Sequence, residues 1–255
     1  ERTEEVDIAL VGKYDLEDAY MSVHEALKHA GIERRTEVNV LWVDSDEMLD
    51  HHEDRLKGAD GVVVPGGFGS RGTEGKLKAI EYCRENDVPF LGLCLGFQMA
   101  VVEHARNVLG LPDAHSAELD PDTEHPVIDI LPEQYEVDEM GGTMRLGAHD
   151  TQIEAGSLAA NVYGDTVCTE RHRHRYEVNP EYIERLEEGA LDFSGRANNR
   201  MEILERTDHP FFLGTQFHPE FRSRPDRASP PFVGFLDAVS GELDARDLAD
   251  REVQA

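Results

Sequence analysis

The chain has 255 residues, 39% of them hydrophobic, and its 53 acidic and 25 basic residues give a formal net charge of -28. This length is enough for one large α/β domain or two small ones. The acidic balance argues against a nucleic-acid partner, because a phosphate backbone is bound through a basic surface. It is typical of a protein kept soluble in concentrated salt, where carboxylates stay hydrated and their repulsion is screened. That interpretation requires the chain to unfold on dialysis into low salt.

Three cysteines, Cys83, Cys94 and Cys168, are too few and too irregularly spaced for a disulfide framework or a zinc site. No apolar stretch reaches the roughly 18 residues of a membrane span, and no signal peptide precedes the first apolar run. These features predict a cytoplasmic protein without a membrane partner. The first residue is Glu1 and not Met, so we expect a piece of a longer protein.

Short apolar runs alternate with segments of helical periodicity in the first part of the chain. The predicted order is a strand at 6–12, a helix at 18–30 that ends at Gly31, a strand at 37–43, a helix at 47–56, and a strand from 61 into a glycine-rich loop at 65–69. Strands that alternate with helices predict βαβ units and a mostly parallel sheet, with ligands beyond the carboxyl ends of its strands.

An apolar run from Val88 ends in Gly92-Leu-Cys94-Leu-Gly96, and an amphipathic segment at 99–108 follows. This is the strand, tight turn and helix order of a nucleophile elbow, with Cys in the place of Ser. Glycines on both sides let the strand and the helix approach each other. A helix N-terminus favours the thiolate of Cys94, which is the nucleophilic form. By itself, the pattern also fits a buried structural cysteine.

The loop Pro65-Gly-Gly67-Phe-Gly69 lacks the Lys-Ser/Thr of a P-loop and the spacing of the dinucleotide fingerprint. An elbow nucleophile needs two oxyanion donors, and the N–H of Leu95 supplies one of them. We therefore interpret the loop as the source of the second backbone N–H. A plain turn is the alternative interpretation.

Residues 120–150 have little periodicity, and two short runs within them, 127–131 and 140–147, suggest a hairpin. The basic run that follows, Glu170-Arg-His172-Arg-His174-Arg-Tyr-Glu177, is an exception to the acidic composition. A strand puts both histidines on one face without a carboxylate at ligand spacing, which disfavours a metal site. Its arginines favour recognition of an anion or a carboxylate.

Two antiparallel strands are predicted at 201–206 and 210–217, joined by a turn at 207–209. The second leads into Gln216-Phe-His218-Pro-Glu220. His218 is a candidate base for Cys94, and Glu220 a candidate for orienting its imidazole. A lone histidine at a strand end is often structural, but the cysteine elbow elsewhere in the chain favours catalysis.

The segments around Cys94 and His218 together resemble the class I, triad-type glutamine amidotransferases. Similarity to one subgroup of that family extends over about residues 6–238, in motifs at 65–75, 91–98, 105–108, 140–147, 170–179 and 223–225. The resemblance implies an α/β three-layer sandwich around a mostly parallel central sheet. Residues 1–240 would form the amidotransferase domain, and 241–255 an acidic tail that is a solvated helix or disordered. Phe97 and His115 depart from the residues common in the family.

The resemblance implies that Cys94 attacks the side-chain amide of L-glutamine and forms a glutamyl thioester, releasing ammonia and then glutamate. His218 and Glu220 would move the protons, and the backbone N–H groups of Gly67 and Leu95 would bind the oxyanion. An α-amino acid also needs a carboxylate for its ammonium group and an arginine for its carboxylate. The residues implied to bind glutamine are Gly67, Leu95, Gln98, Glu118 and Arg175.

In that subgroup an N-terminal synthetase domain, absent from this sequence, receives the ammonia and aminates UTP. The resemblance places ATP, Mg²⁺ and UTP on that domain, places no cofactor or metal on this one, and implies a homotetrameric full enzyme. It also implies GTP as an activator, with contacts at Arg71, Gly72 and Glu74. Two other functions remain open: another class I cysteine amidase such as a γ-glutamyl peptidase, and a noncatalytic domain that binds glutamine or a partner.

Overall fold

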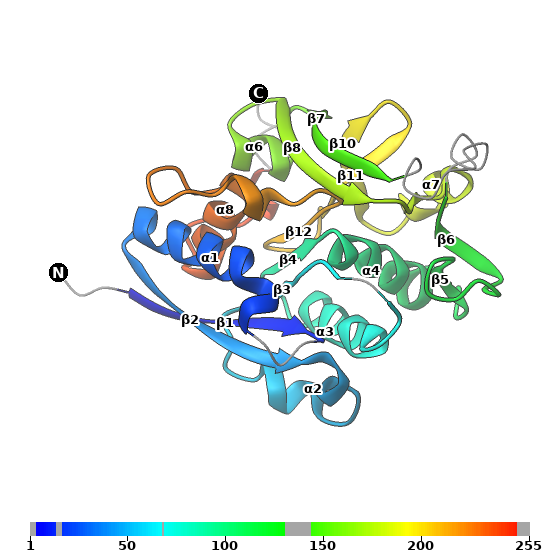
Figure 1. Cartoon of the computed structure of the whole chain (residues 1–255), viewed down its shortest axis with the longest axis horizontal. Helices are drawn as coiled ribbons and strands as arrows, with labels where there is room; N and C mark the ends of the chain where they lie inside the picture. The colour runs from blue at the N-terminus through cyan, green and yellow to red at the C-terminus, as the bar shows by residue number, and fades with distance from the viewer. Residues whose placement is uncertain (1–3, 14–16, 68, 131–143, 249–255) are drawn as a thin grey trace.

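A computed structural model describes residues 4–13, 17–67, 69–130 and 144–248. Nine strands of this part of the chain form one mixed sheet in the order β2-β1-β3-β4-β12-β11-β10-β7-β8. Figure 1 follows it from β2 at the lower edge to β7 and β8 at the top. The parallel half consists of β1 (Glu4–Gly12), β2 (Thr36–Asp44), β3 (Gly61–Val64), β4 (Phe90–Leu93) and β12 (Phe212–Thr215). The antiparallel half consists of β11 (Arg200–Arg206), β10 (Leu191–Ala197), β7 (Arg145–Ile153) and β8 (Val167–His174).

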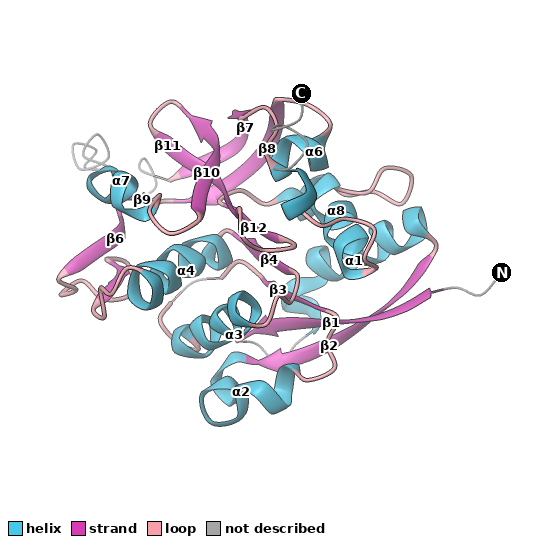
Figure 2. Ribbon diagram, turned by 180° about the vertical axis from the view of Figure 1, so that it is seen from behind, coloured by secondary structure: helices cyan, strands magenta, loops and turns pink. Residues whose placement is uncertain are grey.

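Helices cover both faces of the sheet and make three layers (Figures 1 and 2). One face carries α1 (Met21–Arg34), α6 (Leu158–Tyr163) and α8 (Pro230–Val239), and the other carries α2 (Met48–Leu56), α3 (Thr73–Glu85) and α4 (Leu95–Glu103). Each face has its own buried apolar cluster. The three-layer sandwich is therefore confirmed, whereas the sheet is parallel only in the half that leads to Cys94. No helix within the described ranges combines the length and the apolar character needed to cross a bilayer.

The composition of β3 and β4 explains why these strands lie in the centre of the sheet. All four residues of β3, GVVV, and of β4, FLGL, are buried, as expected for strands covered on both faces. In β8, by contrast, exposed and buried residues alternate, so one face of that strand meets solvent. The remaining strands β5 (Ala114–Ser116), β6 (His125–Asp129) and β9 (Glu177–Val178) form a separate small sheet beside α7 (Ile183–Leu186).

The helix predicted to stop at Gly31 continues to Arg34, and the left-handed residue that ends it is Arg35, with φ 57°. A Cβ on Gly31 would lie 2.7 Å from the carbonyl oxygen of Thr36. The glycine is therefore needed for the close approach of α1 to β2, and the prediction that it terminates the helix is wrong. The strands and the helix predicted at 37–43, 47–56 and 61–64 are present, but α3 was not predicted.

The hairpin suggested within residues 120–150 is not found among the described residues. β6 pairs with β5 and β9 in the small sheet, whereas β7 pairs with β8 and β10 in the large one. Residues 131–143, which include part of the 140–147 motif, lie outside the described residues, as does Phe68 of the glycine-rich loop.

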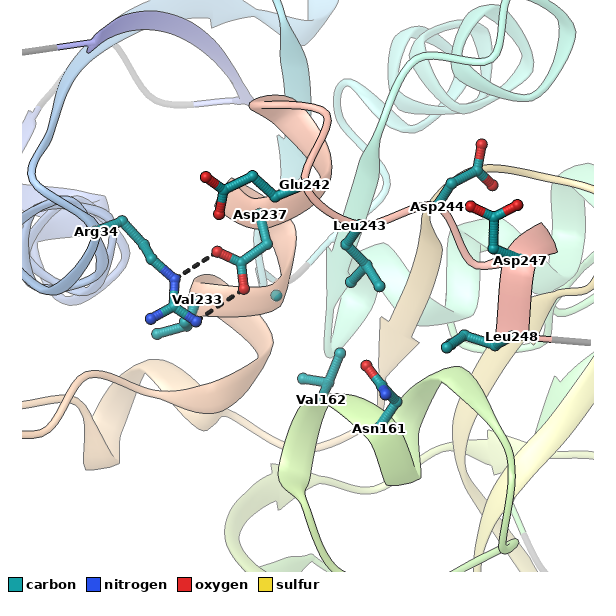
Figure 3. Close-up of a pocket in the computed structure, with 11 residues that line it drawn as sticks. Arg34, Asn161, Val162, Val233, Asp237, Glu242, Leu243, Asp244, Asp247 and Leu248 are labelled. Atoms are coloured by element: carbon teal, nitrogen blue, oxygen red, sulfur yellow. Dashed lines mark hydrogen bonds and ion pairs between the residues drawn. The ribbon is translucent and has the colours of Figure 1, made fainter. Parts of the chain in front are cut away.

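The described part of the acidic tail, residues 241–248, packs onto the domain. The Ala245 side chain is buried, and its backbone N–H donates to the Pro210 carbonyl at 2.7 Å. Leu243 and Leu248 contact the apolar cluster beneath α8. Figure 3 shows the pocket of about 350 Å³ beside this segment, with Arg34 donating to Asp237 at one end. This part of the tail therefore belongs to the domain, which differs from the expectation of a solvated segment; residues 249–255 lie outside the described ranges.

Candidate active site

Cys94 lies between the end of β4 and the first residue of α4. Its φ of 52° and ψ of -97° place a non-glycine residue in a strained backbone conformation, as the elbow pattern predicts. The turn is held from both sides, because the Cys94 N–H donates to the Thr215 carbonyl at 2.7 Å and the Gln98 N–H donates to the Cys94 carbonyl at 3.2 Å. A Cβ on Gly96 would lie 2.1 Å from the Val64 carbonyl oxygen, so only glycine fits there.

His218 follows β12, the parallel neighbour of β4, and so meets the same edge of the sheet as Cys94. A Cβ added to Gly66 would lie 2.9 Å from the His218 ring and 3.5 Å from the Cys94 Cβ, so these two side chains meet beside the glycine-rich loop. The His218 Nδ1 lies 2.7 Å from Glu220 Oε1, and the carboxylate fixes the proton on that nitrogen. All three side chains line one pocket of about 280 Å³.

The electrostatics of His218 are dominated by its two partners. Burial alone would lower the pKa of the imidazole, but the neighbouring Cys94 sulfur and the Glu220 carboxylate outweigh it and raise the pKa of His218 to about 11. The imidazole is therefore positively charged at neutral pH. This positive charge acts directly on Cys94, one of the two groups that raise the pKa of His218.

A second pocket, of about 110 Å³, is also lined by Cys94 and contains every residue expected to bind glutamine. Glu118 and Arg175 supply opposite charges there. Burial raises the pKa of Glu118, and the nearby Arg175 partly offsets this. The buried Nε of Arg175 has no hydrogen-bond partner among the described residues.

Gly67 and Leu95 sit where backbone donors for an oxyanion are expected. Both residues line the small pocket with Cys94, and a Cβ on Gly67 would lie 3.7 Å from Leu95 Cδ2. As the first residue of α4, Leu95 has an N–H group that finds no carbonyl partner inside the helix. Gly67 and Leu95 thus lie on neighbouring segments of one pocket with Cys94.

The three residues expected to contact GTP lie elsewhere, around the start of α3. Arg71 donates to Asp46 at 2.8 Å, and Glu74 accepts from Arg106 at 3.0 Å. Gly72, with φ 74°, precedes the helix. None of the three belongs to the described lining of the two pockets at Cys94.

His172 and His174 both lie on the buried face of β8, as the alternation predicts. The structure also brings Glu202 of β11 to them, so that one potential ligand atom from each residue lies within 4.8 Å of the others. Glu202 is far from both histidines in the sequence and approaches them only in the folded chain, so their spacing gave no sign of it. Burial, with a smaller effect from Arg145, lowers the pKa of His172 to about 2 and of His174 to about 3, so both rings are neutral.

Two further side chains beside Cys94 were not singled out from the sequence. Arg173 lines both pockets. Gln216 is fully buried, and its Nε2 lies 4.0 Å from the Cys94 sulfur. One signal for Gln216 was available, because it stands two residues before His218 and such residues in an extended segment point to the same side.

Comparison with known proteins agrees with this geometry. A model of the glutamine amidotransferase class-I family matches residues 15–238. The chain is 82% identical over 248 residues to the CTP synthase of Haloquadratum walsbyi and 73% identical over 251 residues to that of Haloarcula hispanica. These matches cover 97% and 98% of this chain but 45% of each relative, so the chain spans about half the length of the curated relatives it matches.

Among solved structures, the fold is similar to that of the glutaminase domain of the Trypanosoma brucei CTP synthase with bound acivicin. The TM-score is 0.87 and the identity 40%, over 92% of this chain and 94% of that one. The similarity thus extends over nearly all of both chains. The chain therefore belongs to the class-I glutamine amidotransferase family, in the group formed by the glutaminase domains of CTP synthases.

Proposed function

We propose that this chain hydrolyses L-glutamine to glutamate and ammonia through a thioester on Cys94. The observation that carries this proposal is that Cys94 lines two pockets at once, one with the hydrogen-bonded His218–Glu220 pair and the small one with Glu118 and Arg175. Cys94 is thus next to a group that can transfer protons and to a pocket with opposite charges for the two ends of an amino acid.

The chemistry follows from these positions. The Cys94 thiolate attacks the side-chain amide carbon, and the negative oxygen of the tetrahedral intermediate accepts hydrogen bonds from the N–H groups of Gly67 and Leu95. The C–N bond breaks as His218 gives its proton to the departing nitrogen, which leaves as ammonia. Water then attacks the thioester, His218 takes the proton of that water, and the C–S bond breaks to release glutamate and the thiolate.

The small pocket holds glutamine by its charged α-ammonium and α-carboxylate groups. The Arg175 guanidinium pairs with the α-carboxylate, and the Glu118 carboxylate accepts from the α-ammonium group. Gln98 contacts the substrate from α4. Because Glu118 pairs with a free α-ammonium group, this pocket suits free glutamine better than a γ-glutamyl unit inside a chain, whose α-nitrogen is part of an amide.

Arg175→Met is expected to raise the KM for glutamine about 100-fold and to change kcat little, because it removes a charge-assisted contact made before and during the reaction. Steady-state glutamate release measures both constants. Arg185→Met is the matched control, since Arg185 is an exposed arginine of α7. If Arg175→Met leaves KM unchanged, Arg175 does not bind the substrate carboxylate.

For the whole protein, we propose the CTP synthase reaction, in which a synthetase domain uses ATP and Mg²⁺ to activate UTP and ammonia from this domain converts it to CTP. The names of the relatives support this proposal, as does their length beyond the matched part. A homotetramer and activation by GTP belong to the same proposal. Contacts of GTP with Arg71 and Glu74 would compete with their ion pairs to Asp46 and Arg106.

The three cysteines are unpaired, which favours a reducing, cytoplasmic compartment.

Lowering the KCl concentration from molar to about 0.1 M is expected to unfold the chain, because the screening length grows from about 3 Å to about 10 Å and the repulsion of the acidic surface rises. Circular dichroism and the fluorescence of Trp42, the single tryptophan, report the loss of structure. Returning the sample to molar salt should restore both signals. An unchanged spectrum in low salt would contradict the interpretation of the charge as an adaptation to salt.

A further inference from the structure

Gln216 is a buried residue beside Cys94. Its side chain is 0% exposed, and its backbone N–H donates to the Glu202 carbonyl at 2.8 Å. Its Oε1 accepts from Gln98 Nε2 at 3.2 Å, and its Nε2 lies 4.0 Å from the Cys94 sulfur. A buried amide with this contact to a nucleophile is not used by the mechanism above.

The direction of the Gln216 amide is determined by a chain of hydrogen bonds that begins at a backbone carbonyl. The Tyr176 carbonyl can only accept, so the atom of Gln98 that faces it at 3.1 Å must be the donor Nε2. The same Nε2 faces Gln216, so the Gln216 atom opposite it must be the acceptor Oε1. The Gln216 NH₂ group therefore points at Cys94, and a flipped amide would place two donors against each other.

We propose that Gln216 is a second hydrogen-bond donor to the Cys94 thiolate, complementary to His218 and held in place by Gln98. This inference rests on the proposed function, since it assigns Gln216 a part in the same reaction. A neutral amide stabilises the negative sulfur without giving up a proton. His218 can then give its proton to the departing ammonia while the Gln216 amide stays beside the sulfur. When the thioester breaks, the same amide stabilises the thiolate again.

Other charged groups also act on this sulfur, so the test must isolate the contribution of Gln216. His218 and Glu220 face it after β12, and Arg173 lines both pockets from β8. Glu118 and Arg175 line the small pocket. None of these charges is altered when Gln216 is replaced by an apolar residue of similar size, so a change in the ionisation of Cys94 reports the lost amide.

Gln216→Leu is expected to raise the midpoint of the pH profile for alkylation of Cys94 by iodoacetamide by about one unit. Below the midpoint, the rate should fall about ten-fold, because the thiolate fraction falls by that factor. The rate is followed by mass spectrometry of the Cys94 peptide in molar KCl, and circular dichroism checks the fold. Gln152→Leu, at an exposed position of β7, is the matched control and should leave the profile unchanged.

Gln98→Leu provides a second variant, should Gln216→Leu fail to fold. It removes the group that orients the Gln216 amide, so the midpoint should also move up. The double variant should move it no further than Gln216→Leu alone, because both changes act through one donor. Profiles of the folded variants that superimpose on that of the unaltered chain would overturn the inference.

This experiment separates the inference from the proposed function, because alkylation requires no glutamine. Failure of the unaltered chain to release glutamate would overturn the proposed glutaminase activity. A shifted alkylation profile in such a chain would support the contact of Gln216 with the sulfur and reject its role in glutamine hydrolysis.

Discussion

Cys94→Ala is expected to abolish the release of glutamate from L-glutamine, with a fall in kcat of about ten-thousand-fold or more. The variant keeps the pocket and loses the sulfur that we propose as the nucleophile. Without the thioester, water would have to attack the amide directly, with no activated nucleophile held beside it. The measurement is glutamate formed in molar KCl at saturating glutamine.

Cys83→Ala is the matched control for this variant. Cys83 is fully buried in α3, where burial raises the pKa of its thiol well above the usual value, so it is an inert core residue. Its replacement should cost some stability and leave kcat unchanged. Turnover that survives in Cys94→Ala would show that Cys94 is not the nucleophile.

The unaltered chain has three informative outcomes in the same assay. Turnover that requires Cys94 supports a self-sufficient glutaminase. Absence of turnover together with covalent labelling of Cys94 by a glutamine-mimicking diazo-ketone would mean that the site is formed and requires the rest of the enzyme or GTP. Absence of both would favour the noncatalytic glutamine-binding domain.

Glu220→Gln is expected to lower kcat about a thousand-fold while leaving the shape of the site intact. The amide no longer attracts the positive charge of His218 and can present the wrong group to Nδ1, so the imidazole loses its fixed tautomer. Glu154→Gln is the matched control, since Glu154 is an exposed residue after β7. A kcat within a few-fold of that of the unaltered chain would remove Glu220 from the mechanism.

Glu220→Gln should also change how the folding stability of the chain depends on pH. The pKa of His218, about 11, lies above the ordinary value near 6.5, so the stability that its charge contributes is fully present below about pH 6.5 and is lost as the pH rises through about 11. Removing the Glu220 carboxylate lowers this pKa, and the loss should begin at lower pH. Urea unfolding between pH 6 and 11, in molar KCl, measures the change.

Local features of the site were predictable because they depend on neighbouring residues. The apolar runs that end at Val64 and Leu93 predicted short buried strands, as found, and the glycines around Cys94 indicated a tight turn. His218 and Glu220 are only two residues apart, so the local backbone is enough to bring His218 Nδ1 within 2.7 Å of Glu220 Oε1. Glu118 and Arg175, by contrast, were identified from resemblance to a family and not from spacing.

What the sequence by itself determined is therefore the short buried strands that lead to Cys94, the elbow at Cys94 and the His-x-Glu pair, since periodicity, glycine sterics and short spacings act within a few residues. Only the tertiary structure decided that Glu202 approaches the two histidines, that residues 241–248 pack onto the domain, and that Gln216 faces Cys94 across 122 positions of sequence. Contacts of that kind join residues far apart in the sequence, and these residues come together only when the sheet forms.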